Sequence, residues 1–381
     1  MSESMIEQST ERLFAGAVNR QLLLAFEAGQ PPTALWQSVA DQGLPLALAA
    51  EAAGGIQASW REAYPILRGL GYWQVPLPLA ETMIAALLLS AAGIDVPDGA
   101  IALVESSPEG PDGVLLLSGD AAHPALSGRV LRVPWASACR WAVVSLVDAG
   151  KHGGAADAAR PACGQIALID LHDTASVAIT SRPNPAGEPV CETVLQNAPC
   201  LALAANPLPG LDRPVRTLGA IAYSVMMVGA IEYLLEQSVQ YASDRVQFGR
   251  PIGKNQAIQQ QLALLAGEVA AARVAAIVAC DDAPSLGTAA SPATVFSAAV
   301  AKIRGGEAAT RATSIAHQVH GAIGFTQEHG LNFATRRLWA WREAYGADAW
   351  WAGRLGAAAI QAGAAGFWPG VTDRQFNGLT G

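Results

Sequence analysis

The sequence is poor in charge. Only 15% of its 381 residues are Asp, Glu, Lys or Arg, against 51% hydrophobic residues. It has no run of basic residues, no basic stretch interleaved with aromatics, and a net charge of −8, which argues against a nucleic-acid partner. Low charge beside many Ala and Gly residues has two readings: a surface covered by neighbouring subunits, or simply an Ala-rich composition.

Cysteine is also scarce. Five cysteines are scattered through the chain without a Cys-x-x-Cys pair, which argues against a zinc site or a disulfide framework. The N-terminus has no apolar signal core, so we expect a cytoplasmic protein with reduced thiols. The longest mainly apolar stretch, residues 218–235, contains Tyr223, Ser224 and Glu232. It therefore predicts a buried core helix, not a membrane span.

The hydrophobic pattern changes twice along the chain. Helical periodicity is typical of both ends, and short apolar runs separated by Gly, Pro, Asp and Ser occupy the middle. We expect a mostly α protein with a small central antiparallel β barrel or sandwich. The predicted parts are an N-terminal helical domain (1–97), a β domain (98–208), a C-terminal four-helix bundle (209–366) and a loose tail (367–381).

Individual elements can be predicted as well. In the N-terminal part the expected helices are 33–44, 60–70 and 81–92. In the middle the expected strands are 100–104, 114–117, 130–133, 141–146, 165–171 and 176–180, with a mobile loop at 151–161. In the C-terminal part the first helix starts at Asp212–Pro214 and the second carries Leu262, Leu265 and Val269. The third covers 293–320, and the fourth covers 340–361 with an interruption near Gly346.

Two segments of the C-terminal part stand out. Residues 241–256 read YASDRVQFGRPIGKNQ, and residues 318–325 read QVHGAIGF. The first places Arg245 at the end of a long helix, then Phe248 and a turn-forming Gly249, with Gln256 opening the next helix. Taken alone, a surface Arg before a plain loop would explain such a segment.

Together the two segments resemble the signatures of the acyl-CoA dehydrogenase family, flavoenzymes that desaturate acyl-CoA thioesters. The resemblance implies FAD as cofactor, held across a subunit interface by Arg245, Phe248 and Gln256, with Gln318, Gly321 and Ala322 from the second segment. Small residues there would let the cofactor approach the backbone closely. In style the chain resembles the small subunits of bacterial two-component acyl-CoA dehydrogenases, of the pimeloyl-CoA or steroid side-chain type.

The sequence departs from the family where catalysis needs a carboxylate. The usual general base would fall on Tyr345, and the alternative position of some members falls near Gly219. Glu343 and Asp348 flank the first position and are weak substitutes, so the catalytic residue stays unknown. The family's Thr-Glu-Pro and Trp-x-Thr segments of the middle domain are also missing.

Two further clusters allow a bland and a functional interpretation. His317 and His320 lie three residues apart but have no carboxylate motif beside them, so we expect packed or solvent-facing histidines and no metal site. Four tryptophans near the lost base could line an acyl pocket, although a helix or subunit contact is the simpler reading. They are Trp339, Trp341, Trp350 and Trp351.

Three functions remain open at this point. The first is an FAD-dependent acyl-CoA dehydrogenase acting on fatty-acid or steroid side-chain thioesters, active alone as a homo-oligomer such as a tetramer or as one subunit of a hetero-oligomer. The second is a non-catalytic partner that completes the FAD site of a homologous large subunit in a hetero-oligomer. The third is a flavin-free scaffold. The sequence does not name the acyl group or the electron acceptor.

Overall fold

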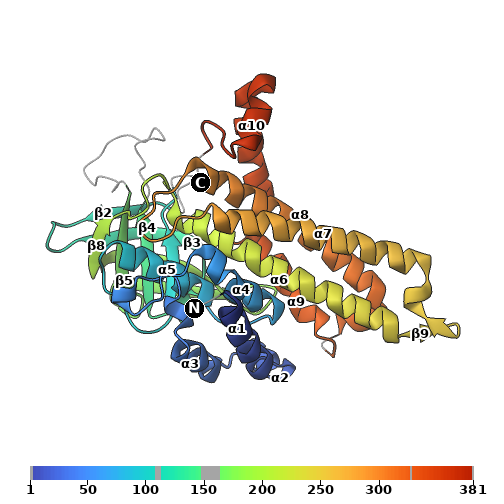
Figure 1. Ribbon diagram of the computed structural model, residues 1–381. Coiled ribbons are helices and arrows are strands. Elements are labelled where there is room, and N and C mark those ends of the chain that lie inside the picture. The colour runs from blue at the N-terminus through green and yellow to red at the C-terminus, as the bar shows by residue number, and fades with distance from the viewer. Residues whose placement is uncertain (1–2, 108–112, 147–163, 327, 380–381) are drawn as a thin grey trace.

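The computed structural model describes residues 3–107, 113–146, 164–326 and 328–379. Five helices form the N-terminal part: α1 (Glu3–Ala17), α2 (Arg20–Glu27), α3 (Thr33–Asp41), α4 (Trp60–Tyr72) and α5 (Leu79–Ala91). A capping box between Ser59 and Glu62 starts α4, and α5 follows directly on Pro78. Almost every side chain of α5 is buried, including Glu81, its one acid. This part packs against the sheets and the bundle (Figure 1).

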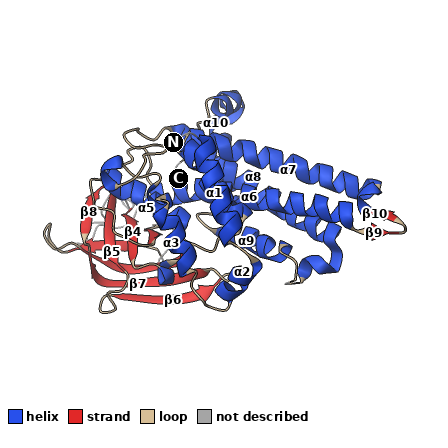
Figure 2. Cartoon of the chain, turned by 60° about the horizontal axis from the view of Figure 1, so that its bottom comes forward, coloured by secondary structure: helices blue, strands red, loops and turns tan. Residues whose placement is uncertain are grey.

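Eight strands form two four-stranded sheets that share one core. They are β1 (Ile101–Glu105), β2 (Leu115–Ser118), β3 (Ala125–Pro134), β4 (Trp141–Leu146), β5 (Gln165–Asp170), β6 (Val177–Pro183), β7 (Pro189–Pro199) and β8 (Ala202–Ala205). The strand orders are β1-β4-β5-β8 and β2-β3-β7-β6, and Figure 2 shows the strands gathered at one end of the molecule. Buried side chains of both sheets form a single apolar cluster, which makes this part a sandwich.

Two strand predictions need correction. The expected sheet was antiparallel throughout, but β1 pairs with β4 in parallel, with Ile101 opposite Trp141. The strands β7 and β8 were not predicted, because β7 is bounded by prolines and contains several polar residues, while β8 is a four-residue Ala-Leu-Ala-Ala segment without β-branched or aromatic side chains. The loop expected at 151–161 lies outside the described residues.

A bundle of long helices follows: α6 (Pro214–Asp244), α7 (Gln256–Asp281), α8 (Pro292–His320) and α9 (Leu331–Glu343). A small hairpin of β9 (Val246–Gln247) and β10 (Arg250–Pro251) joins α6 to α7 at the end far from the sheets (Figure 1). The N-cap of α6 is Arg213, one residue after the predicted Asp212, and Pro214 is its first residue. The mostly helical fold with a central β part is therefore confirmed.

The fourth predicted helix is in fact two. The chain breaks at 344–347, as expected near Gly346, but α9 begins earlier and α10 (Asp348–Thr372) runs into the segment predicted to be a loose tail. Helix α10 is kinked at Gly363 and projects from the body (Figure 1). The domain boundaries drawn from sequence stay a prediction.

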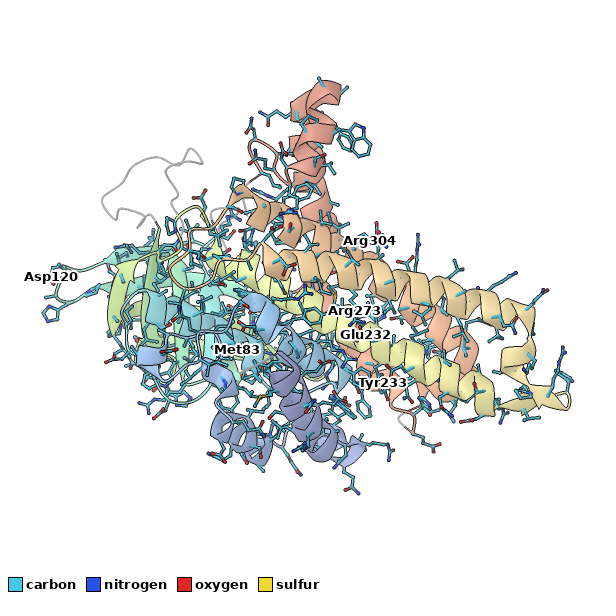
Figure 3. All side chains as sticks on the ribbon, in the orientation of Figure 1. Met83, Asp120, Glu232, Tyr233, Arg273 and Arg304 are labelled. Atoms are coloured by element: carbon cyan, nitrogen blue, oxygen red, sulfur yellow. The ribbon has the colours of Figure 1, made fainter. Side chains whose placement is uncertain are left out.

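Helix α6 is the axis of the bundle. It is long and apolar enough to cross a membrane, but 89% of its most apolar window is buried inside the protein, as expected for a core helix. Its one acidic side chain in this region, Glu232, accepts a hydrogen bond of 2.6 Å from Arg68 of α4 and lies 3.8 Å from Arg273 of α7 (Figure 3). These ion pairs fix α6 between its neighbours.

Candidate functional site

The hairpin between α6 and α7 holds most of the predicted cofactor residues. Phe248 and Gly249 form its two-residue turn, and both have positive φ, 52° and 78°. Such a turn matches the twist of the flanking strands, but a Phe rarely adopts this conformation. The Phe248 side chain is 103% exposed. An aromatic ring that is fully exposed at a hairpin tip is available for contact with another molecule.

The same tip carries positive charge without partners. Arg245, Arg250 and Lys254 are exposed, and none of them forms a salt bridge with the described residues. Gln256 is the first residue of α7, as predicted, with Asn255 as its N-cap. Unpaired guanidinium groups beside an exposed aromatic ring are the donors that a phosphate-containing ligand requires.

The second signature segment lies beside the first. Gln318 is exposed near the end of α8, and Gly321 begins a short 3-10 helix, Gly321–Phe325, with φ of 65°. The ring of Tyr241 on α6 stacks on that of His320, with centroids 4.6 Å apart, so the structure brings the two segments together. A side chain placed at Gly321 would meet nothing within 4 Å, and Ala322 is exposed as well. The backbone here is open to a ligand.

Helix α7 adds an uncovered apolar face. Its most apolar window is only 33% buried. Leu264 and Val274 on this helix are each 62% exposed, and Phe325 at the nearby end of α8 is 69% exposed. Apolar exposure along a long helix is typical of surfaces that contact another protein.

The position expected for the catalytic carboxylate lies at the opposite end of α6. Tyr345 has φ of 54° and follows the end of α9. Its ring packs on Gly219: a Cβ at that glycine would lie 2.4 Å from the ring. The two positions at which a base was sought are therefore neighbours in space, and the tyrosine fills the room that a side chain at 219 would need.

A buried carboxyl group, missed by the sequence reasoning, meets this tyrosine. Glu81 is 1% exposed, and its Oε1 accepts hydrogen bonds from Tyr223 at 2.6 Å and from Tyr345 at 3.2 Å. Burial raises the pKa of Glu81 to about 7, with the two tyrosines opposing this rise. Burial, followed by the Glu81 charge, also raises the pKa of Tyr345 well above its ordinary value. We call Glu81, Tyr223 and Tyr345 the Glu81 cluster.

A second buried acid stands behind this cluster. Glu188 is 3% exposed and lies 3.3 Å from the guanidinium of Arg337, and it accepts a 3.0 Å hydrogen bond from Trp341. Burial raises its pKa, and the nearby Arg337 opposes that rise. Glu188 is thus a paired structural carboxylate, whereas no cation is among the causes that shift the pKa of Glu81.

A buried lysine stabilises the end of α9, just before Tyr345. Lys302 of α8 donates from Nζ to the carbonyl oxygens of Trp341 at 2.8 Å and Arg342 at 3.0 Å, which caps the last turn of α9. Burial lowers its pKa to about 7. Trp351 donates to the Tyr345 carbonyl at 3.1 Å. Glu81 has a sequence signal, as the lone charge in an apolar helix, whereas Lys302 shares its helix with several other charged residues and has none.

The weak candidates for a base, Glu343 and Asp348, lie outside the Glu81 cluster. Glu343 is exposed at the end of α9. Asp348 pairs with Arg342 at 2.7 Å and accepts a hydrogen bond from the amide of Ala349, so it starts α10. Among the tryptophans, Trp341 and Trp351 are buried between helices and Trp339 is 44% exposed. Trp350 lies between Arg216 and Arg354, at 4.7 and 4.8 Å. The helix-contact interpretation therefore fits Trp341 and Trp351, whereas Trp339 is exposed and Trp350 is partly exposed.

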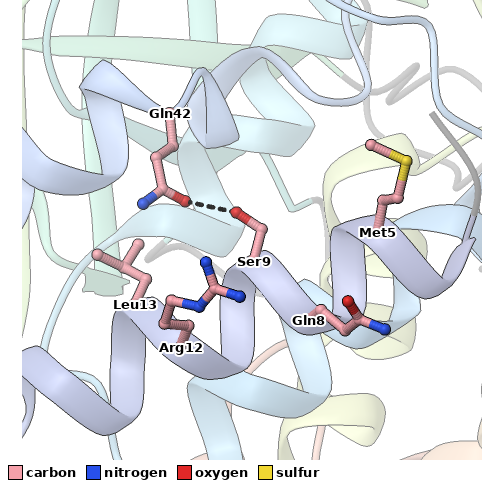
Figure 4. Close-up of a pocket in the computed structure, with 6 residues that line it drawn as sticks. All are labelled: Met5, Gln8, Ser9, Arg12, Leu13 and Gln42. Atoms are coloured by element: carbon pink, nitrogen blue, oxygen red, sulfur yellow. Dashed lines mark hydrogen bonds between the residues drawn. The ribbon is translucent and has the colours of Figure 1, made fainter.

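A hollow on α1 and the two histidines of α8 are weaker candidates for a site. A shallow hollow of about 300 Å³ lies on α1, lined by Met5, Gln8, Ser9, Arg12, Leu13 and Gln42 (Figure 4). Its only charged lining residue is Arg12, and a hydrogen bond between Ser9 and Gln42 crosses it. His317 and His320 pack against aromatic rings. In the part of the chain that the structure describes, no three metal-binding side chains come together.

Helices, a strand sandwich and a bundle with a protruding hairpin define the fold of the acyl-CoA dehydrogenases. Residues 216–359 match the family described as acyl-CoA dehydrogenase, C-terminal domain. Acyl-CoA dehydrogenase IpdE2 of Mycobacterium tuberculosis is 29% identical over 305 residues, which cover 80% of this chain and 79% of that protein. The chain is therefore similar in sequence to acyl-CoA dehydrogenases over most of its length, which confirms the resemblance.

Solved structures agree with this fold over nearly the whole chain. The ChsE4-ChsE5 complex from Mycobacterium tuberculosis matches with a TM-score of 0.78 and 20% identity, covering 94% of this chain and 97% of that one. The structure of PigA with FAD and proline matches with a TM-score of 0.76 and 17% identity, covering 93% and 98%. At these identities the structures establish the fold alone.

Proposed function

We propose that this chain is a subunit of an FAD-dependent acyl-CoA dehydrogenase and works in a hetero-oligomer with a homologous subunit. It contributes Arg245 and Phe248 to the binding site of an FAD. The catalytic carboxylate of that active site belongs to the partner subunit. FAD, when bound, accepts the hydride that leaves the β carbon of the acyl-CoA. We expect a cytoplasmic enzyme, tetrameric in the manner of the family, acting on a fatty-acyl or steroid side-chain thioester.

One observation carries the proposal: the two halves of a complete active site lie at opposite ends of α6. Gly219, under Tyr345, and Arg245 are separated by 26 helical positions, about 39 Å at 1.5 Å per residue. A dinucleotide gripped by the hairpin therefore cannot serve the Tyr345 region of the same chain. The hairpin residues must act on the site of a neighbouring subunit.

The residues of the hairpin fit the part of FAD assigned to them. Arg245 would pair with the pyrophosphate, and Arg250 and Lys254 add positive potential. Phe248 supplies an apolar face, while Gln256 and Gln318 can hydrogen-bond the polar edge of the cofactor. Open backbone at Gly321 and Ala322 allows the adenosine half to approach closely. The uncovered face of α7 provides the contact area for the neighbouring subunit.

The chain's own acyl site is unsuited to remove a proton. Burial and the Glu81 charge disfavour the phenolate of Tyr345, the form that could act as a base. Its ring also occupies the space above Gly219. These two facts favour a partner-supplied base over an independent enzyme.

A second candidate is an independent acyl-CoA dehydrogenase that uses Glu81. Its pKa of about 7 suits a general base at neutral pH. This reading requires Tyr345 to swing away, because its hydroxyl group is hydrogen-bonded to the Glu81 carboxyl group.

The experiment that separates these functions is purification of the chain alone and after co-expression with a homologous dehydrogenase that carries the usual Glu. We expect a colourless chain alone and a yellow, active complex. Within the complex, Arg245→Ala should lower the flavin content, while Arg182→Ala on the distant strand β6 should not. A yellow and active chain on its own would instead support the second candidate, and a colourless, inactive complex would leave the scaffold.

A further inference from the structure

Three aromatic rings join the two cofactor segments at the base of the hairpin. Tyr241 and His320 stack at 4.6 Å with an interplanar angle of 27°. His329, which precedes α9, packs edge-on against His320 at 4.7 Å and against Tyr241 at 6.5 Å. Tyr241 is directly tied to the hairpin, because the amide of Arg245 donates to its carbonyl at 2.9 Å. His320 immediately precedes Gly321. We call these three residues the ring joint.

Two further rings extend this arrangement. His317 stacks on Phe325 at 4.1 Å, with an angle of 18°. A Cβ at Gly324 would lie 3.1 Å from Cβ of His320 and 3.3 Å from Nδ1 of His317, so the turn after α8 packs tightly on both histidines. The position of the second segment therefore depends on how these two rings sit.

One ring nitrogen of His320 is paired and the other is not. Its Nδ1 lies 2.8 Å from the carbonyl oxygen of Ala316, to which a protonated Nδ1 donates. Its Nε2 is buried without a full hydrogen bond to any described residue, although the Gln237 backbone beside the ring raises its pKa. Nδ1 of His329 accepts from the amide of Leu331 at 3.2 Å, so that nitrogen is unprotonated. Protonation of this nitrogen would break the contact.

The surroundings of the joint offer no negative charge. Groups that face His320 are Tyr241 and the Gln237 backbone from α6, His317 and the Ala316 carbonyl from α8, and His329. No carboxylate is among the groups that affect its pKa. Burial lowers the pKa of all three histidines, and His317 and His329 lower that of His320 further. Protonation of the joint would place like charges on adjacent rings.

We propose that His320 is a positioning residue that holds segments 241–256 and 318–325 together while neutral, and that acidification loosens this joint and weakens the grip on FAD. The effect on FAD rests on the proposed function. The loosening of the joint does not, because it follows from the contacts within this chain. Acid therefore weakens the cofactor-binding end of the bundle, whereas at the other end it is a rise in pH that weakens the Glu81 cluster.

Hydrogen–deuterium exchange of the full chain tests the joint without any cofactor. After correction for the intrinsic effect of pH, we expect amides in 245–252 and 317–325 to lose about tenfold protection between pH 7.5 and pH 5.5, while β4 and β5 stay unchanged. His320→Phe keeps an aromatic ring and cannot titrate, so its loss should be several-fold smaller. His123→Phe, on the exposed β2–β3 loop, should respond like the wild type.

A second variant and a second readout keep the test decisive. His329→Gln removes one facing charge and should give a response between those of the wild type and His320→Phe, even if the latter folds poorly. Equal pH responses in the wild type and both variants would overturn the proposal. In the co-expressed complex, FAD affinity should fall with the same pH profile. A pH-dependent joint without any FAD binding would refute the proposed function while leaving the joint intact.

Discussion

The packing of Tyr345 on Gly219 can be tested by adding one methyl group. In Gly219→Ala the new Cβ would lie 2.4 to 2.7 Å from three atoms of the tyrosine ring, which is far inside van der Waals contact. The ring cannot retreat freely, because Tyr223 packs edge-on against it at 5.0 Å and its hydroxyl group is bonded to Glu81. Overpacking of this kind costs about 1–3 kcal/mol.

The cost should disappear when the ring is removed. Tyr345 adopts a left-handed φ of 54°, so glycine is the replacement that fits this backbone without strain. In the Tyr345→Gly background, Gly219→Ala should be neutral or stabilise by roughly 0.5–1 kcal/mol, because alanine is favoured inside a helix. The two changes should therefore couple by roughly 1–4 kcal/mol, above the roughly 0.3–0.5 kcal/mol seen between independent sites.

Urea unfolding followed by tryptophan fluorescence measures the four corners of this cycle. Gly229→Ala is the matched control on the same helix, since its Cβ would meet the backbone carbonyl of Arg68 at 2.0 Å. That clash is with α4, so Tyr345→Gly should not relieve it. If Gly219→Ala costs the same stability with and without the tyrosine ring, Tyr345 does not pack on Gly219.

Two further predictions concern buried charges near Tyr345. A carboxyl whose pKa rises from 4.5 to about 7 on folding binds its proton more tightly in the folded state, so Glu81 costs up to about 3 kcal/mol of stability as pH rises from 5 to 8. Glu81→Gln should remove that loss in pH-dependent unfolding, whereas Glu51→Gln on an exposed turn should not, and parallel pH curves would contradict the burial argument. Lys302→Met leaves the carbonyl oxygens of Trp341 and Arg342 without their hydrogen-bond donor, so it should destabilise the protein by about 1–3 kcal/mol and speed amide exchange at 344–347. The exposed Lys254→Met is the control, and unchanged exchange in Lys302→Met would exclude the capping role.

Much of the fold follows from patterns that a sequence carries locally. The apolar stripe of α6, the turn after Arg245 and the break at Gly346 were predictable, because periodicity and glycine act over a few residues. The strands β7 and β8 and the parallel pairing of β1 with β4 were not. Pairing joins residues 40 positions apart along the chain, as Ile101 and Trp141 are, and no local pattern specifies it.

The candidate site shows the same division. Arg245, Phe248 and Gln256 lie within one short segment, so their spacing is visible in the sequence and the structure brings them to one tip. The Glu81 cluster draws one residue each from α5, α6 and the turn after α9, 264 positions apart at the extreme. Glu81 is a single acid in an apolar helix, and only the fold reveals that two tyrosines meet it.

The buried carboxyl group of Glu81 gives a physical reason for a tyrosine, instead of an acid, at position 345. A carboxylate at position 345 would lie beside Glu81, in a place where burial already raises the pKa of that group to about 7. Two buried carboxyl groups so close cannot both ionise, so one proton would stay shared between them and the substituted acid would be a poor base at neutral pH. A hydroxyl group at 345 instead donates to Glu81 and adds no charge. With Glu81 and Tyr223 in place, the fold favours a neutral donor at this position, so the missing base and the buried glutamate are parts of one arrangement.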